Sequence, residues 1–503
     1  MLASGWTRRE FLLQASLAVL ATGFARGSEP AASLATPSGR LRGELAEGVR
    51  VFRGIPFAHP PIGSLRFRPP EKFVWSGERD ATRFAPAAMQ SSRGMAMSED
   101  CLALNVWTPQ GRGPFPVFVW IHGGGFLGGR SSEPVLDGAE MARAGVVCIT
   151  VAYRLGVFGF LDMEPLLGPS YAGSANLALH DLIAALRWVH ENVEAFGGDP
   201  ERVTVGGESA GAKLTGILMS IAEARPYFHQ MISQSGGAER VGTREHSQRV
   251  SEGFAEELKN AGVKNVREAP AEELIALQHK FLTRWPEHFP LRAEIDGHLI
   301  PRLPTESIAA GSARGKRLLL GTMRDESALF IGAHPKHEVV AGDLGNLALP
   351  RFTDVAKRYH DVYPQMGAEE LRIRALTAEE YWIPSMRMAA AHLQDGGACW
   401  LYRVDFSESS GAYAGRAEHG LDVRLVWNRP SAIAANAVEE AALARQMNQA
   451  WIRYIRGEAP AAQGLPEWPR MERTVRYTML LDHASRVEKN PQEAELRLWN
   501  GVL

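Results

Sequence analysis

Cysteine is scarce in this chain of 503 residues, which contains only Cys101, Cys148 and Cys399. An odd and sparse set excludes a disulfide framework, and no C-x-x-C pair provides the spacing of a zinc or redox site. Cys148 and Cys399 lie within apolar runs, where a free thiol behaves as a small hydrophobic side chain. We therefore expect structural cysteines and neither a metal ion nor an organic cofactor.

A strong charge of one sign is also absent. Lys and Arg number 55 against 57 Asp and Glu, so the formal net charge is −2. No long basic run provides the electrostatic footprint of a nucleic-acid-binding protein. We therefore expect no nucleic acid as partner.

An apolar run long enough to cross a bilayer is missing near the N terminus. The run 11–24 has 14 residues, whereas a membrane-spanning helix needs roughly 20. It follows the pair Arg8-Arg9 and precedes a stretch of small residues, which is the pattern of a cleaved export signal. The paired arginines resemble the signal of the bacterial twin-arginine route. We predict that residues 1–30 direct export to the periplasm or beyond and leave no stable membrane anchor; an amphipathic N-terminal helix is the alternative.

Apolar runs alternate with helical patterns along the rest of the chain. Strands are predicted at 116–121, 146–153, 203–205, 231–233, 318–320 and 400–404, and helices at 177–195, 210–221 and 443–455. This alternation is typical of βαβ units around a mainly parallel sheet. Because no repeat or long linker divides the chain, we expect residues 31–503 to form one α/β domain, with helical cap insertions near 238–295 and 328–395.

A G-x-S-x-G motif is formed by Gly207-Glu208-Ser209-Ala210-Gly211. The motif alone has little specificity, but a predicted strand leads into it and a predicted helix follows. This is the context of a nucleophile elbow, in which a sharp turn exposes the serine hydroxyl above the sheet edge. Ser209 is therefore the candidate nucleophile.

A glycine-rich loop, His122-Gly123-Gly124-Gly125, follows the predicted strand 116–121. Loops of this kind, upstream of the nucleophile, supply backbone amides to an oxyanion hole. A phosphate-binding loop is excluded because no Gly-Lys-Ser/Thr follows. We expect the amides of Gly124, Gly125 and Ala210 to face the oxyanion.

A serine hydroxyl needs a general base, because it is a weak nucleophile at neutral pH. His419 follows the predicted strand 400–404, and the pair Asp325-Glu326 follows the predicted strand 318–320. The order serine, acid, histidine is the one expected of an α/β-hydrolase. Spacing alone leaves open whether Asp325 or Glu326 is the acid.

Two longer segments resemble the signatures of the type-B carboxylesterases, the family that also contains the cholinesterases. Residues 196–211, F-G-G-D-P-E-R-V-T-V-G-G-E-S-A-G, resemble its serine signature, and residues 99–106, E-D-C-L-A-L-N-V, its second signature. The resemblance runs from about residue 37 to the C terminus. It implies an α/β-hydrolase fold, a mostly parallel sheet flanked by helices. By match to the family's motifs it implies these site residues: Ser209, Glu326 and His419 for catalysis, and Gly124, Gly125 and Ala210 for the oxyanion hole.

The resemblance also implies a reaction. We expect a serine hydrolase that cleaves small-molecule carboxylic esters to acid and alcohol through an acyl-enzyme, with activity falling below about pH 6.5 as His419 protonates. No aromatic residue stands between Met89 and Asp100, which argues against choline esters. The alternatives are an amidase, lactonase or peptidase with the same residues, or a non-catalytic binding module.

Overall fold

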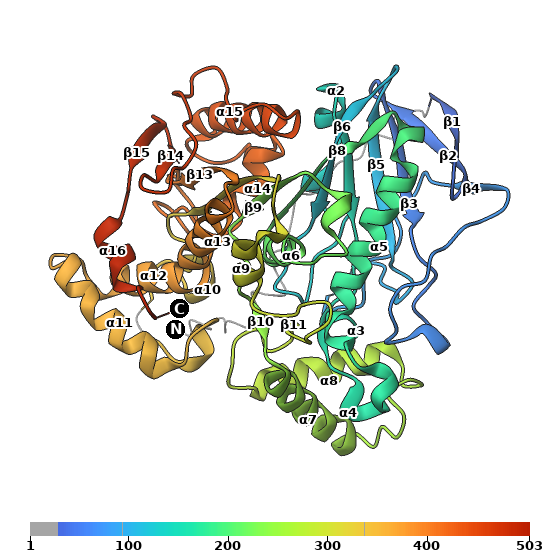
Figure 1. Cartoon of the computed structure of the whole chain (residues 1–503), viewed down its shortest axis with the longest axis horizontal. Coiled ribbons are helices and arrows are strands. Elements are labelled where there is room, and N and C mark those ends of the chain that lie inside the picture. Colours follow the sequence, from blue (N-terminus) through green and yellow to red (C-terminus); the bar gives the residue numbers. More distant parts are fainter. Residues whose placement is uncertain (1–28, 93, 336–337, 503) are drawn as a thin grey trace, which may run out of the picture.

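One large twisted sheet runs through the part of the chain that the structure describes, residues 29–502 apart from 93 and 336–337 (Figure 1). In this computed structural model the strand order is β1-β2-β3-β5-β7-β6-β8-β9-β12-β13-β14-β15, with β4 beside β2. The strands are β1 (Glu29–Thr36), β2 (Gly39–Ala46), β3 (Val49–Pro56), β4 (Glu78–Asp80), β5 (Ala103–Pro109), β6 (Phe115–Ile121), β7 (Val147–Val151), β8 (Gly198–Glu208), β9 (Gln230–Gln234), β12 (Arg317–Met323), β13 (Ala398–Val404), β14 (Tyr477–Leu481) and β15 (Arg486–Lys489). A separate short pair is formed by β10 (Val241–Gly242) and β11 (Ala293–Glu294).

The central strands, from β7 to β14 in the sheet order, pair in parallel. The outer strands at both ends are antiparallel, apart from the short β4, which pairs in parallel with β2. β6 shows why the centre is buried on both faces. Val117 and Val119 belong to the hydrophobic core on one face, and Phe118 and Trp120 to the core on the other. A strand with two buried faces must be apolar at successive positions, which is why it appears in the sequence as a continuous hydrophobic run.

Helices cover both faces of the sheet. The helices of eight or more residues are α5 (Leu177–Asn192), α6 (Ala210–Leu218), α7 (Arg244–Asn260), α8 (Ala271–Arg284), α11 (Leu349–Val362), α12 (Ala368–Thr377), α13 (Ile383–Gln394) and α15 (Ala437–Ile455). Side chains of α5, α6 and α13 contribute to one core, and those of α15 and the short α14 (Leu421–Val426) to the other. In Figure 1, α7 and α8 gather below the sheet, while α11 and α12 lie beside α16 (Glu493–Leu498).

The predicted α/β class is confirmed, because each predicted strand and helix of the central region coincides with an observed one. The antiparallel strands at the two ends of the sheet were not predicted. The predicted insertions carry α7 and α8 in one segment and α11 to α13 in the other. The predicted export signal lies almost wholly outside the described residues, since β1 begins at Glu29. Within the described part, no helix is long and apolar enough to cross a membrane.

Candidate active site

The three predicted catalytic side chains come from neighbouring strands of the sheet. Ser209 stands between β8 and α6, Glu326 follows β12, and His419 lies in the segment between β13 and α14. In the sheet, β8, β9, β12 and β13 are consecutive and parallel, so their carboxyl ends meet at one edge. The crevice outside these carboxyl ends is where open α/β sheets bind ligands.

These side chains form a continuous hydrogen-bonded row. His419 Nε2 lies 2.8 Å from Ser209 Oγ, and His419 Nδ1 lies 2.5 Å from Glu326 Oε2. The other oxygen of Glu326 accepts a hydrogen bond of 2.8 Å from the amide of Met323. Glu326 is fully buried, while Ser209 and His419 are each 9% exposed. The carboxylate is therefore held from two sides, and the imidazole bridges it to the hydroxyl.

Ser209 has a strained backbone, with φ 55° and ψ −123°. A non-glycine residue rarely adopts positive φ, and such strain is concentrated at functional sites. The turn is tight because α6 begins directly after β8, and a Cβ on Gly211 would overlap with the carbonyl oxygen of Ile121 in β6. The amide of Ser209 donates to the carbonyl of Gln234 at 2.9 Å, which fixes the turn to β9.

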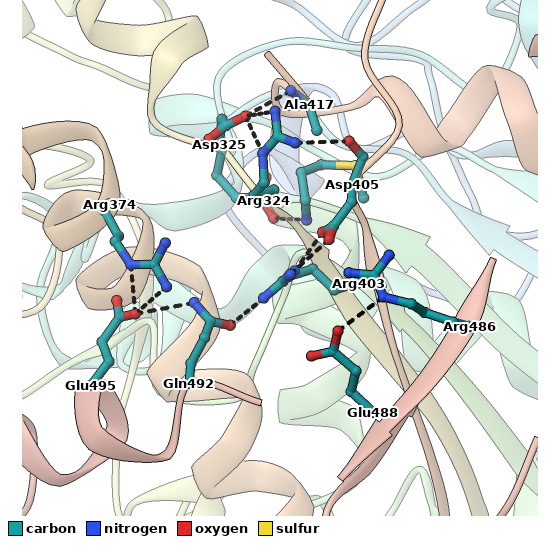
Figure 2. A network of polar contacts seen from close by, with 12 residues as sticks. Arg324, Asp325, Arg374, Arg403, Asp405, Ala417, Arg486, Glu488, Gln492 and Glu495 are labelled. Carbon is teal, nitrogen blue, oxygen red and sulfur yellow. Dashed lines mark hydrogen bonds and ion pairs between the residues drawn. The ribbon is translucent and has the colours of Figure 1, made fainter. Parts of the chain in front are cut away.

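The neighbouring carboxylate, Asp325, takes part in a different network (Figure 2). Its Oδ2 accepts hydrogen bonds of 2.9 Å from the amide of Ala417 and from Arg324 Nε. Arg324 also donates to the carbonyl of Asp405, which pairs with Arg403. Asp325 thus anchors the segment that carries His419, whereas Glu326 contacts the imidazole itself. Of the two acids between which spacing could not choose, Glu326 is the one that contacts the histidine.

The glycine loop places unpaired amides beside the serine. Gly124 and Gly125 have φ values of 115° and 62°, and a Cβ on Gly124 would overlap with the carbonyl oxygen of Gly128. Ala210 is the first residue of α6, where a helix leaves its amides without intrahelical acceptors. Within the described residues, no backbone or side-chain oxygen accepts a hydrogen bond from these three amides. Three donors thus remain without an acceptor among the described residues.

The glycine loop is held in place by a residue that the sequence analysis did not identify. Gln90 accepts a hydrogen bond of 3.0 Å from the amide of Gly129 and donates one of 2.9 Å to its carbonyl. Gln90 lies in irregular chain, 39 residues before Gly129. Nothing in its local sequence indicates this contact.

A second carboxylate lies next to the imidazole. Oε1 of Glu208, the residue before Ser209, lies 3.2 Å from His419 Nε2. Burial raises the pKa of Glu208 to about 7. Burial also acts to lower the pKa of His419, but the charges of Glu208 and Glu326 outweigh it, so the net effect is a raised pKa. The imidazolium is therefore stabilised by two carboxylates.

Aromatic rings from the second insertion enclose the histidine. The ring centroid of Tyr381 lies 4.6 Å from that of His419, and the centroid of Phe330 lies 5.2 Å from it. Tyr381 belongs to η9 (Ala378–Trp382), a π-helical turn between α12 and α13. No sequence motif marks these residues, because they reach the site only through tertiary packing.

A serine on a strand-to-helix turn, at the carboxyl edge of a mostly parallel sheet, in contact with a histidine and an acid that follow two later strands, is typical of an α/β-hydrolase. The model of the carboxylesterase family matches residues 30–499, and the chain belongs to that family. It is accordingly a carboxylic ester hydrolase.

The chain is similar to known esterases over nearly its whole length. The chain is 34% identical to the para-nitrobenzyl esterase of Bacillus subtilis (strain 168), covering 91% of this chain and 96% of the relative. It is also 34% identical to the fumonisin B1 esterase of Sphingopyxis macrogoltabida, covering 94% and 89%. Among solved structures, a Geobacillus stearothermophilus carboxylesterase superposes with a TM-score of 0.81 at 34% identity, covering 93% of this chain and 99% of the other.

Proposed function

We propose that Ser209 is the nucleophile, His419 the general base and Glu326 the acid that orients the base. The observation that carries this proposal is the row of contacts from Ser209 Oγ through both nitrogens of His419 to Glu326 Oε2, at 2.8 and 2.5 Å. A base within hydrogen-bond reach of the hydroxyl and oriented by a third group is the geometric signature of an activated nucleophile.

In the acylation step, Ser209 Oγ attacks the ester carbonyl carbon while its proton passes to His419 Nε2. Negative charge develops on the carbonyl oxygen, and we assign the amides of Gly124, Gly125 and Ala210 to stabilise it. Glu326 keeps the Nδ1–H tautomer in place and stabilises the imidazolium. His419 then protonates the leaving alkoxide, and the alcohol departs from the acyl-enzyme.

In the deacylation step, a water molecule replaces the alcohol. His419 removes its proton as the oxygen attacks the acyl carbonyl, and the second tetrahedral intermediate collapses with return of that proton to Ser209 Oγ. The carboxylic acid is released. Glu208 lies 3.2 Å from Nε2 in both steps. Because its pKa is about 7, its ionised form adds a second negative charge beside the imidazolium, and we assign it a positioning and electrostatic role.

We further propose that the insertions near 238–295 and 328–395 act as the cap of the site. Support comes from the aromatic residues that they contribute, since Phe330 and Tyr381 pack against His419 and Phe289 packs against Gly125 of the glycine loop. Residues 1–30 are proposed to direct export through the twin-arginine route, on the evidence of the Arg8-Arg9 pair and the short apolar run.

The experiment that tests the catalytic proposal is a panel of 4-nitrophenyl esters of increasing acyl length, assayed with the wild-type enzyme and with Ser209→Ala. Removal of the nucleophile should lower kcat by about 10⁴-fold or more. The position of the rate maximum along the panel reports the acyl length that the site accepts. Equal rates for variant and wild type would refute the assignment of Ser209.

A further inference from the structure

A buried group of charged side chains lies beside the site, and we call it the Lys213–Arg240–Glu380 cluster. Lys213 stands in the first turn of α6, and its amide donates to the carbonyl of Ser209 at 2.9 Å. Arg240 precedes β10, and Glu380 belongs to η9. One carboxylate oxygen of Glu380 pairs with Lys213 and the other with Arg240. Three distant segments thus bring two cations and one anion together.

The charges in this cluster do not balance. Lys213 is 4% and Arg240 2% exposed, and both share the single carboxylate of Glu380. Nε and Nη1 of Arg240 are buried without a hydrogen-bond partner among the described residues. A buried charge that lacks a partner costs free energy, as does each buried donor left unsatisfied. A further anion that reached Arg240 would satisfy these two donors.

The adjacent Glu379 offsets this imbalance only in part, although its charge acts on both Arg240 and Lys213. Its carboxylate accepts hydrogen bonds from three consecutive backbone amides, those of Gly345, Asn346 and Leu347. Burial, together with the charge of Glu380, raises the pKa of Glu379 to about 7. Glu379 is thus directed to the backbone of another segment and is partly protonated near neutral pH.

One aromatic ring separates the cluster from the general base. Lys213 Nζ lies 4.6 Å from the ring centroid of Tyr381, and that centroid lies 4.6 Å from the ring of His419. Tyr381 and Glu380 are neighbours in the π-helical turn η9. Single π-helical turns inserted into helices occur frequently at functional sites. The same turn therefore contributes to the surroundings of the base and to the charged cluster.

A second ring connects the cluster to the glycine loop. A Cβ on Gly125 would lie 2.6 Å from the ring of Phe289, so this ring packs directly against the loop. Arg240 Cζ lies 5.3 Å and Lys213 Nζ 5.9 Å from the centroid of the same ring. Phe289 has φ 51°, a conformation that marks a strained and functionally constrained segment. The cluster therefore borders the acyl-transfer site on two sides.

We propose that the Lys213–Arg240–Glu380 cluster binds a free carboxylate carried by the ester substrate, so that the enzyme prefers esters with an additional ionised carboxyl group. This inference rests on the proposed roles of Ser209 and His419. A guanidinium presents its donors in a planar fork that matches a carboxylate, and Arg240 has two nitrogens available for it. Lys213 lies four residues after Ser209, a rise of about 6 Å along α6, and a half-ester of adipic acid spans such a separation.

The test compares two substrates that differ at the distal carboxyl group, which is ionised in 4-nitrophenyl hydrogen adipate and esterified in 4-nitrophenyl methyl adipate. We expect wild-type kcat/KM to be at least about tenfold higher for the anionic ester. Arg240→Leu should reduce this ratio to near one, and Arg240→Lys should retain part of it. Arg314→Leu, an exposed arginine paired with Asp395, serves as the matched control and should leave the ratio unchanged.

A second pair, 4-carboxyphenyl acetate and its methyl ester, places the charge on the leaving group instead. Preference for the anionic member of either pair, lost in Arg240→Leu, supports the proposal and shows which part of the substrate carries the carboxylate. If Arg240→Leu does not fold, the wild-type ratios and Arg240→Lys decide. Equal rates within both pairs, still dependent on Ser209, would overturn this inference alone, whereas rates unaffected by Ser209→Ala would overturn the proposed function as well.

Discussion

At the scale of single residues, His419 lies between two carboxylates, and this arrangement sets the pH range of the reaction. The base must be neutral to accept the proton of Ser209. Its raised pKa means that it is protonated at a higher pH than an ordinary histidine. We therefore predict that kcat/KM falls, as the pH is lowered, through a midpoint above 6.5, higher than the sequence alone suggests.

Glu208→Gln tests this prediction. Loss of the charge 3.2 Å from Nε2 should lower the pKa of His419 and move the acidic limb of the pH profile to lower pH. Glu208 itself has a pKa of about 7. The acidic limb of the wild-type pH profile therefore reports the coupled titration of Glu208 and His419. Glu194→Gln, at an exposed position, provides the control. An unchanged limb in Glu208→Gln would show that this carboxylate does not act on the base.

Substitution of Asp325 should affect mainly stability, and substitution of its neighbour Glu326 should affect mainly catalysis. Glu326→Gln keeps the shape but removes the charge that fixes the imidazole tautomer, so kcat should fall by about 10⁴-fold with little change in KM. Asp325→Asn weakens the pair with Arg324 and the anchor at Ala417, so it should lower Tm while kcat stays within about tenfold. Steady-state kinetics and thermal unfolding of both variants check this, and a reversal of the two effects would make Asp325 the acid.

At the scale of elements, the glycine loop is built by close backbone approach. Gly124→Ala would place a Cβ against the carbonyl oxygen of Gly128, at a φ of 115°. The loop must shift, and the amides leave their positions, so kcat should fall by about 10²–10³-fold, the usual effect of losing one oxyanion donor. Gly367→Ala, where a Cβ meets open space, is the control. Near wild-type kcat in Gly124→Ala would exclude this loop from the oxyanion hole.

Residues that follow the central strands could be predicted from the sequence, whereas residues on the insertions could not. Ser209, His419 and the pair Asp325-Glu326 could be predicted as neighbours because each follows a buried parallel strand, and such strands bring their carboxyl ends to one edge. The choice of Glu326 within the pair came from the family resemblance. Tyr381, Phe289 and the Lys213–Arg240–Glu380 cluster could not be found in this way. They reach the site through the packing of long insertions, whose helices are visible in the sequence but whose docking is not.

The strand pattern shows the same limit. Central strands form short apolar runs, which can be recognised in the sequence. β2 mixes buried and exposed positions, and β15 contains no fully buried residue. Strands at the margins of a sheet are partly covered, so their hydrophobic signal is weak and their pairing depends on the neighbouring strand.

At the scale of the whole molecule, folding encloses every cysteine. Cys101, Cys148 and Cys399 are all free and buried, and burial raises the pKa of each thiol well above its usual range. A thiol reacts as its thiolate, so the folded chain should protect all three. Residues that pair across the sheet are far apart in the sequence, so this protection requires that the chain has folded before it meets an oxidising compartment.

The protection of the cysteines predicts how the protein reacts with a thiol reagent. The native enzyme should react with a thiol reagent such as 5,5′-dithiobis(2-nitrobenzoate) only at the rate at which it unfolds. After denaturation, the reagent should release three equivalents of thionitrobenzoate per chain, one for each cysteine of the sequence. Fewer than three equivalents after denaturation would reveal a disulfide and hence export of the unfolded chain. Three equivalents from protein recovered outside the cytoplasm would agree with export of a folded molecule, as the paired arginines at the N terminus predict.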